Sequence, residues 1–231
     1  MPVVGYQNLS TEQGFNFTVP TFKAVGDKAI DIQDIQLNFG EGEASGGDNI
    51  QILGTGGEML EQYYWLPKMY MEGADKDGWA NSETFRLAEK TINDGEGFLV
   101  DIVDPSTTKI VYSGEVSKEK TEISNTIMGF NWTGNNAPRT IDIQDIQLNF
   151  GEGEASGGDN IQILGTGGEM LEQYYWLPKM YMEGADKDGW ANSETFRLAE
   201  RELTAGQGFL IDIVIPSTKI ILPEGFVEKK N

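Results

Sequence analysis

The sequence predicts an all-β protein with two tandem, near-identical domains, each an antiparallel β-sandwich or a small barrel. Two observations support this prediction. Residues 30–89 recur letter for letter as residues 141–200, so sixty consecutive positions match at a constant offset of 111. Within each copy, short runs of alternating apolar and polar residues are separated by turn-forming residues about every 8–12 positions, and no run has the length of an amphipathic helix.

The repeat also predicts where the domains begin and end. The match continues in weaker form beyond the identical block, because residues 90–103 (KTINDGEGFLVDIV) correspond to residues 201–214 (RELTAGQGFLIDIV). A copy of roughly 110 residues is far longer than a solenoid repeat and can bury a core of its own. We therefore expect one domain over residues 1–117 and another over residues 118–231, joined near the polar residues 117–121 (SKEKT).

Three causes would keep the block unchanged beside flanks that have diverged. Recent gene conversion within an older duplication is the simplest cause, engineering is a second, and a requirement for two identical surfaces is a third. The first and the third are compatible, since a protein that tolerates identical neighbours also gains a repeated surface.

The first elements of each copy are predicted from their apolar period. Residues 14–19 (GFNFTV) alternate strictly, which is typical of a half-buried strand. Residues 30–39 (IDIQDIQLNF) change phase after Gln33, which predicts a bulge or a break in the strand. Residues 40–47 (GEGEASGG) form a loop by composition, and residues 49–53 (NIQIL) a short strand.

The later elements follow the same logic. Residues 59–71 (MLEQYYWLPKMYM) are strand-like on both sides of Pro67, which cannot donate to a ladder and so predicts an edge strand or a break. Residues 73–81 (GADKDGWAN) predict a turn. Residues 98–103 (FLVDIV) form the strongest predicted strand, and residues 109–112 (KIVY) complete the copy.

Composition excludes several classes of function. The chain has no Cys and no His, which removes disulfides, thiolate chemistry and the usual general base at neutral pH. Its net charge of −20 leaves no basic patch for phosphate, so we expect no nucleic-acid binding. No apolar run is long enough to span a bilayer, so we expect no membrane insertion. High acidity without Cys favours solubility in an extracellular or cell-surface location.

A calcium site is the one cofactor that the sequence suggests. An Asp-Lys-Asp-Gly run follows a glycine turn in each copy, and hard oxygen ligands on such a turn suit calcium. The candidate ligands are Asp75, Asp77, Asp186 and Asp188. In an EF-hand alignment, however, Gly73 and Thr84 occupy two ligand positions. A plain turn before a buried Trp is therefore the favoured interpretation, with no cofactor.

Aromatic residues are concentrated in the middle of each copy. In an alternating strand only every second side chain faces inward, so Tyr63 and Trp65 share one face and Tyr64 takes the other. Core and interface packing is the favoured interpretation. The alternative is a flat platform for a polysaccharide. Its residues would be Tyr64, Trp65, Trp79, Tyr175, Trp176 and Trp190.

No catalytic residues are predicted. Paired carboxylates such as Asp31 with Asp34 could in principle perform glycosidase chemistry. In a chain with 37 acidic residues such pairs arise by chance, and a small module rarely provides a deep cleft. We therefore expect a protein that is not an enzyme.

Four short motifs occur in a fixed order. They are Gly-Phe-Asn in the opening strand, Asp-Gly-Trp (residues 77–79 and 188–190), Gly-x-Gly-Phe (residues 95–98 and 206–209) and Ser-Gly-Glu-Val (residues 113–116). In this order the chain resembles repetitive β-rich modules of secreted and surface proteins of some environmental bacteria. The resemblance implies an extracellular structural protein and carries over no catalytic residues. Copy two departs from the last motif, reading LPEGFV at residues 222–227.

These observations predict a structural subunit of a filament, fibre or surface layer. The middle of each copy is identical while the ends differ, so the end of one chain could meet the start of another in a head-to-tail contact that propagates into a homopolymer. The residues expected in this contact are Val3, Val4, Tyr6, Ile220, Ile221 and Phe226. The alternative is a bivalent carbohydrate- or surface-binding module.

Overall fold

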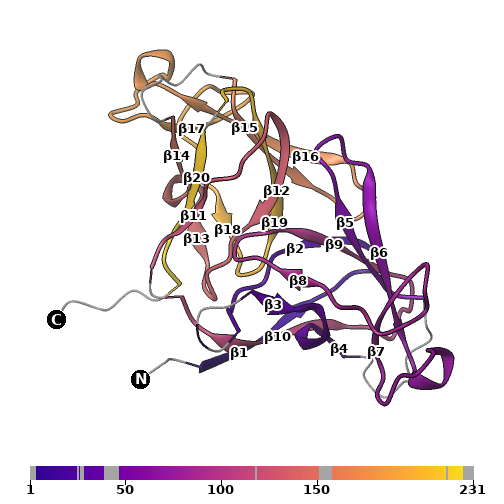
Figure 1. Cartoon of the computed structure of the whole chain (residues 1–231). Helices are drawn as coiled ribbons and strands as arrows, with labels where there is room; N and C mark the ends of the chain where they lie inside the picture. Colours follow the sequence, from indigo (N-terminus) through magenta and orange to yellow (C-terminus); the bar gives the residue numbers. More distant parts are fainter. Residues whose placement is uncertain are drawn as a thin grey trace.

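The computed structural model describes residues 4–24, 26, 29–38, 47–117, 119–150, 158–216 and 218–225 (Figure 1). The protein is 48 % strand, and no helix in the described part reaches seven residues, which confirms the predicted all-β class. Its antiparallel sheets are distributed over two similar halves, so the repeat in sequence is also a repeat in structure. Among the described residues, no helix has the length and apolar character needed to cross a membrane.

In its described part, the first half contains three antiparallel sheets. The three-stranded sheet has the order β1 (Val4–Ser10), β10 (Lys109–Glu115), β4 (Gln36–Asn38). The five-stranded sheet has the order β2 (Gly14–Thr18), β9 (Phe98–Ile102), β5 (Asn49–Leu53), β6 (Met59–Leu66), β7 (Gly78–Asn81). The two-stranded sheet pairs β3 (Ile30–Asp31) with β8 (Thr91–Ile92).

The second half repeats these sheets strand for strand. Its three-stranded sheet has the order β11 (Thr121–Ile123), β20 (Lys219–Leu222), β14 (Gln147–Asn149). Its five-stranded sheet has the order β12 (Gly129–Gly134), β19 (Gly208–Ile213), β15 (Asn160–Leu164), β16 (Met170–Leu177), β17 (Gly189–Asn192). Its two-stranded sheet pairs β13 (Ile141–Asp142) with β18 (Glu202–Leu203).

Short 3-10 turns interrupt the strands at equivalent places. They are η1 (Ile32–Asp34), η2 (Lys68–Tyr70), η3 (Ile143–Asp145) and η4 (Lys179–Tyr181). The first of them lies where the sequence predicts a break. The carboxylate of Asp31 caps η1 by accepting from the backbone N–H of Gln33, which explains why the apolar period changes phase there.

One predicted break is confirmed, and one predicted turn is different in the structure. The strand β6 ends at Leu66, directly before Pro67, and the segment that follows is the turn η2. The predicted turn at residues 73–81 ends earlier, because its last four residues form β7. The side chain of Gln33 stabilises β7 by accepting from the Trp79 N–H and donating to the Trp79 carbonyl. A Cβ on Gly78 would lie 2.3 Å from the Gln33 side-chain oxygen, so a larger residue there would displace the Gln33 side chain.

The N-terminal strand pairs within its own half. The head-to-tail hypothesis adds this strand to the sheet of a neighbouring molecule, but β1 runs antiparallel to β10 over seven residue pairs and is an edge strand of that sheet. Its counterpart β11 begins at Thr121, within the segment expected to be a linker. The connection between the last strand of the first half and the first strand of the second is therefore the short stretch between Glu115 and Thr121.

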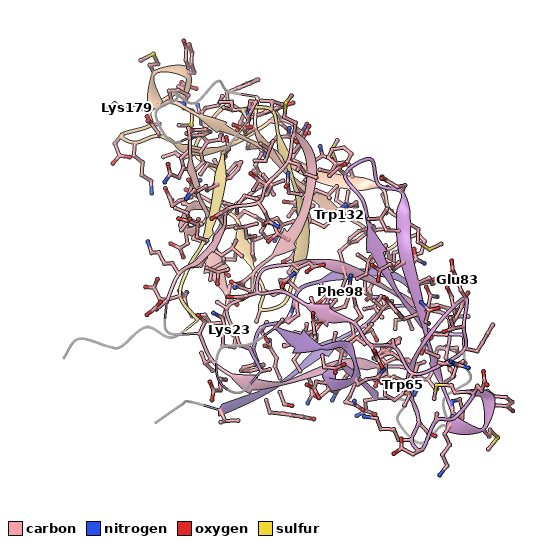
Figure 2. All side chains as sticks on the ribbon, viewed as in Figure 1. Lys23, Trp65, Glu83, Phe98, Trp132 and Lys179 are labelled. Atoms are coloured by element: carbon pink, nitrogen blue, oxygen red, sulfur yellow. The ribbon has the colours of Figure 1, made fainter. Side chains whose placement is uncertain are left out.

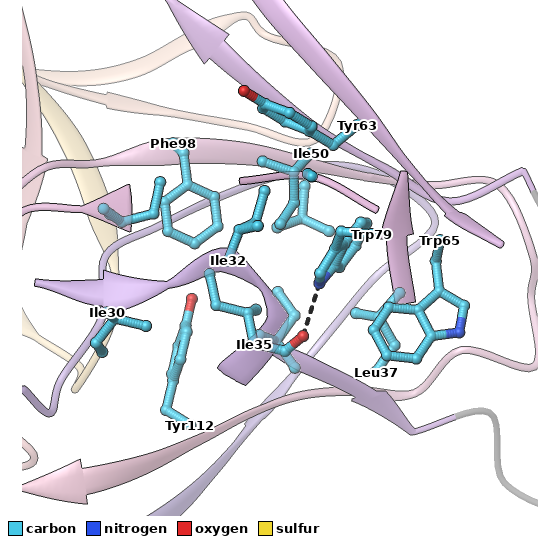
Figure 3. Packing of buried hydrophobic residues seen from close by; sticks show 14 of the residues in the cluster. Ile30, Ile32, Ile35, Leu37, Ile50, Tyr63, Trp65, Trp79, Phe98 and Tyr112 are labelled. Atoms are coloured by element: carbon cyan, nitrogen blue, oxygen red, sulfur yellow. Dashed lines mark hydrogen bonds between the residues drawn. The ribbon is translucent and has the colours of Figure 1, made fainter. Parts of the chain in front are cut away.

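Each half encloses a core centred on one tryptophan. Trp79 is fully buried, donates from Nε1 to the Ile35 carbonyl at 2.7 Å, and meets Trp65 edge to face (Figure 3). In the second half Trp190 donates to the Ile146 carbonyl at 2.8 Å and meets Trp176 in the same way. The buried indole N–H therefore has a partner in both cores, as burial of a donor requires.

Candidate interaction surfaces

The two halves contact each other through reciprocal hydrogen bonds. The Phe15 N–H donates to the Thr166 carbonyl, and the equivalent Phe130 N–H donates to the Thr55 carbonyl. A contact in which equivalent residues exchange roles is isologous, so the halves are related by an approximate two-fold axis. Figure 1 shows β2, β9, β12 and β19 side by side where the halves meet.

The same reciprocity appears in side chains and glycines. The Thr18 hydroxyl donates to the Gly206 carbonyl at 2.9 Å. Its equivalent, Thr133, donates to the Gly95 carbonyl at 2.7 Å. The rings of Phe17 and Trp132, which are also equivalent, stack on each other across the interface at 5.3 Å. The Gly-x-Gly-Phe motif of the sequence therefore supplies the turn that each half offers to the opening strand of the other.

Asp94 connects the halves through contacts that the second half does not repeat. The carboxylate of Asp94 accepts from the Thr121 hydroxyl at 2.6 Å and from the Asn136 side chain at 2.8 Å, and it forms an ion pair with Lys23 at 3.0 Å. The equivalent position in the second half is Ala205. These contacts, together with the reciprocal ones, fix how the halves sit relative to each other.

Each half ends in an apolar tip at the far side from this interface. We define the first tip as residues 67–86 and the second as residues 178–197; they are identical in sequence. In the first tip Met69, Tyr70 and Phe85 are 78 %, 66 % and 51 % exposed. Their counterparts in the second tip are Met180, Tyr181 and Phe196, exposed to nearly the same extent.

The tip has a defined local structure. The Asp77 carboxylate stabilises the η2 turn by accepting a hydrogen bond from the Lys68 N–H at 2.8 Å. The Glu72 N–H donates to the Phe85 carbonyl at 3.1 Å, which ties the two apolar segments together. The Arg86 guanidinium then forms an ion pair with Glu72 at 2.9 Å. The apolar side chains are therefore presented by a hydrogen-bonded frame.

Phe85 adopts a backbone conformation that large residues avoid. Its φ is +52°, and that of Phe196 is +53°; no other non-glycine residue in the described part has a positive φ. The left-handed region costs an L-residue roughly 1–2 kcal/mol, and Gly or Asn is the usual occupant. A half-exposed aromatic ring recovers only part of its burial free energy. Strain of this kind, repeated in both halves, marks a candidate functional position.

The two tips lie at opposite ends of the molecule. Figure 1 shows the coiled ribbon that follows β6 at one extreme of the view and the one that follows β16 at the other. Figure 2 labels Lys179, the first residue of η4, at one of these ends. Each tip carries three basic and four acidic residues, a net charge of −1, in a chain of net charge −20.

The residues predicted for head-to-tail assembly are scattered in the structure. Val4 and Tyr6 are exposed on the edge strand β1. Ile220 is fully buried and Ile221 half-buried, because β20 is the central strand of its sheet. Val3 and Phe226 lie outside the described residues. Ile220 therefore belongs to the core of its own half, and it cannot be offered to a neighbour while that half is folded.

The residues predicted as a ligand platform are mostly core. Trp79 and Trp190 are fully buried, and Trp65 and Trp176 are buried beside them, because they occupy the inward positions of β6, β7, β16 and β17. The favoured interpretation of these four residues, packing in the core, agrees with this placement. Only Tyr64 and Tyr175, on the outer face, are half-buried.

The four aspartates suggested for calcium are exposed and do not converge. Asp77 and Asp188 each accept a backbone N–H, from Lys68 and Lys179, which gives them a structural role. Within the described ranges, no three side chains of Asp, Glu, His or Cys gather to hold a metal ion.

Two equivalent grooves run along the interface between the halves. The first, of about 690 Å³, is lined by Phe15, Asn16 and Glu12 from one half and by Thr166 and Glu169 from the other. The second, of about 540 Å³, has the matching lining, with additional acidic groups. These grooves contain polar groups from both halves, which sequence reasoning could not bring together.

A tyrosine and a lysine influence one carboxylate of the second groove. The Tyr63 hydroxyl donates to Glu61, and Lys90 forms an ion pair with it at 3.0 Å. Both contacts lower the pKa of Glu61, the tyrosine more strongly, and burial opposes them. This carboxylate is therefore already partnered and has no character of a general acid.

The sequence matches no family model, no curated protein and no solved structure. Interpretation of the two tips and the two grooves therefore depends on their own chemistry.

Proposed function

We propose that the protein is a structural subunit that carries one interaction surface twice and assembles with other copies of itself at an extracellular or cell-surface location. A single observation supports this most directly. The apolar tips are identical, each contains a strained and exposed phenylalanine, and they lie at opposite ends of two halves joined by reciprocal contacts. Exposed apolar clusters of this kind are typical of interaction sites.

Several features agree with a scaffold and not with catalysis. The chain lacks His and Cys, and two carboxylates of the second groove, Glu61 and Asp94, are bonded to neighbouring groups. The short motifs resemble β-rich modules of bacterial secreted and surface proteins, which supports an extracellular location. We infer that each half is a β-sandwich, because residues of its three-stranded sheet, such as Tyr112, and of its five-stranded sheet, such as Val100, share one core.

The test is direct imaging of the purified full chain. Negative-stain electron microscopy and light scattering, with and without millimolar calcium, should reveal regular filaments or sheets of large and concentration-dependent mass. Uniform monomers at every concentration would contradict a structural subunit. A requirement for calcium would give a metal role to the exposed aspartates.

A bivalent carbohydrate-binding module is the second candidate, and the interface grooves favour it. Each groove combines an aromatic residue, Phe15 or Phe130, with amide and carboxylate side chains from both halves, which is the chemistry that sugars require. A glycan array on the monomeric protein tests this function. Binding that is lost in a Glu169→Ala variant would place the ligand in the first groove.

A further inference from the structure

We propose that two molecules join tip to tip through an isologous contact about a two-fold axis, and that repetition of this contact at both ends of each molecule produces a linear polymer. This inference rests on the proposed function and names the surface and the partner, a second copy of the chain. It replaces the head-to-tail contact through the terminal strands.

Each tip exposes large apolar side chains. Met69, Tyr70 and Phe85 are large side chains on one hydrogen-bonded frame, and all three are more than half exposed. The frame is anchored by Met71, which is buried directly after η2. Apolar side chains that are exposed on an already ordered frame lose little conformational entropy when they are covered, so they suit a protein partner.

The tip carries little of the net charge of the chain. The chain carries −20, but each tip carries only −1. Two copies therefore repel each other least when they approach through their tips. A cationic partner would instead be attracted to the remainder of the molecule, which holds almost all of the negative charge. The near-neutral tip is therefore the part of the surface that repels an acidic partner least, and a second copy is such a partner.

The charged groups of the tip are complementary to those of a second copy. Arg86 and Glu72 form an exposed ion pair beside the apolar side chains. In an isologous contact residue i of one molecule meets residue j of the other, and residue j meets residue i. The pair can therefore exchange partners across the axis, so that each guanidinium meets the carboxylate of the opposite molecule. The same pair, Arg197 with Glu183, is present in the second tip.

Each molecule carries the tip twice, and this number decides what the contact builds. An isologous contact closes a dimer when a molecule has one such surface. This molecule has two, they are identical, and the reciprocal contact between the halves holds them apart at opposite ends. A subunit with two identical sites of this kind forms a chain of any length. The length of the polymer then depends on protein concentration.

The experiment counts subunits by light scattering and sedimentation. The full-length protein should form polymers. Phe85→Asn alone leaves one working tip and should stop at a dimer of twice the monomer mass, and Phe196→Asn should behave identically. The double variant should remain a monomer. Asn tolerates the left-handed conformation, so these variants keep the turn, which circular dichroism verifies.

A charge exchange provides a second and independent test. One double variant, Arg86→Glu with Arg197→Glu, has only acidic groups at both ion-pair positions. The other double variant, Glu72→Arg with Glu183→Arg, has only basic groups there. Each should be monomeric alone, and an equimolar mixture should polymerise. Tyr6→Ser on the edge strand β1 is the control, and it should polymerise as the unchanged protein does.

The outcomes separate this inference from the proposed function. Polymers that persist in the double Phe variant, or that disappear with Tyr6→Ser, would overturn the tip contact and leave a structural subunit in place. Single-tip variants that form long polymers would also overturn it. A monomeric unchanged protein whose tips bind a glycan array, with loss in the double variant, would overturn both proposals in favour of a bivalent binding module.

Discussion

The two halves share sixty residues letter for letter, and yet they treat the same buried aspartate differently. Asp48 accepts backbone N–H groups from Val103 and Asp104, both at 2.8 Å, and a hydroxyl from Thr107. Asp159 keeps the two backbone donors, at 2.7 and 3.4 Å. Its second oxygen has no hydrogen-bond partner among the described residues.

The flanking sequence causes the difference. The first half reads DPSTTKI at residues 104–110, and the second reads IPSTKI at residues 215–220, one residue shorter. Burial therefore raises the pKa of Asp159, the backbone donors oppose the shift, and the nearby Asp212 adds to it. Identical sequence thus gives an identical fold here, but residues outside the block decide the energetics of groups inside it.

The largest expected effect tests how far the halves are alike. Trp79→Ala and Trp190→Ala each remove a fully buried indole and its hydrogen bond, and each should lower the free energy of unfolding by about 3–5 kcal/mol. Because the hydrogen-bond acceptor of each indole and the tryptophan that it meets come from the identical block, the two losses should be equal. Urea unfolding followed by circular dichroism measures them. Clearly unequal losses would show that the flanks also control the cores.

The next effect tests the reciprocity of the interface. A Cβ on Gly208 would lie 2.6 Å from the Thr18 nitrogen, and a Cβ on Gly97 would lie 2.8 Å from the Thr133 nitrogen. Gly208→Ala and Gly97→Ala should therefore push the halves apart and cost about 1–3 kcal/mol each. Unfolding curves and limited proteolysis near Thr121 monitor the change. A variant as stable and protected as the unchanged protein would contradict the close approach.

A smaller effect isolates one asymmetry of the interface. Trp132 donates from Nε1 to the Gly54 carbonyl at 2.8 Å, whereas its equivalent, Phe17, has no donor. Trp132→Phe makes the halves alike and should cost about 1 kcal/mol, the usual net contribution of one hydrogen bond. Phe17→Leu, which removes the stacking partner and keeps this bond, is the comparison. A Trp132→Phe variant as stable as the unchanged protein would contradict a contribution from this hydrogen bond.

The smallest effect is a pH dependence confined to the second half. Since the folded-state pKa of Asp159 is raised above its ordinary value of 3.8, the folded protein binds this proton more tightly than the unfolded chain. The contribution of Asp159 to stability should therefore increase as the pH falls through the raised pKa and be complete below 3.8. When the free energy of unfolding is measured from pH 7 downwards, the Asp159→Asn variant should lack this increase in stability.

Asp48→Asn is the matched variant for that measurement. Since the Thr107 hydroxyl donates to Asp48, the substitution replaces an acceptor by a donor and should cost stability at neutral pH. Direct titration of the Asp159 carboxyl by NMR provides a second readout. A midpoint at or below 3.8 would refute the raised pKa.

Strands with a strict two-residue period could be predicted from sequence. Residues 49–53 are β5 as expected, and residues 98–103 contain β9. β11 was not predicted, because three residues carry no period. The sequence pattern assigns β7 to a turn because the Asp-Gly pair at its start is a turn signal, and the stabilising Gln33 lies 46 positions away.

The candidate surfaces were harder to predict than the fold. Period-two reasoning placed Tyr63 and Trp65 on one face, as in the structure, but it could not show that this face is the inward one, nor that β20 is a central strand and Ile220 is buried. The tips had a weak signal, Met and Tyr directly after Pro67. Nothing in the sequence indicates that Phe85 has a positive φ, because Gly or Asn is the expected residue there.

The reciprocal interface has a consequence for how such a chain can arise. Each half presents both an opening strand and the turn that receives it, so a polypeptide containing one half has all that it needs to pair with a copy of itself. Fusing two copies through the few residues between Glu115 and Thr121 turns that encounter into an intramolecular one, at an effective concentration of roughly millimolar. Once fused, the strands Gly14–Thr18 and Gly129–Gly134 no longer face their own duplicates and are free to diverge, as phenylalanine and tryptophan have done at their centre.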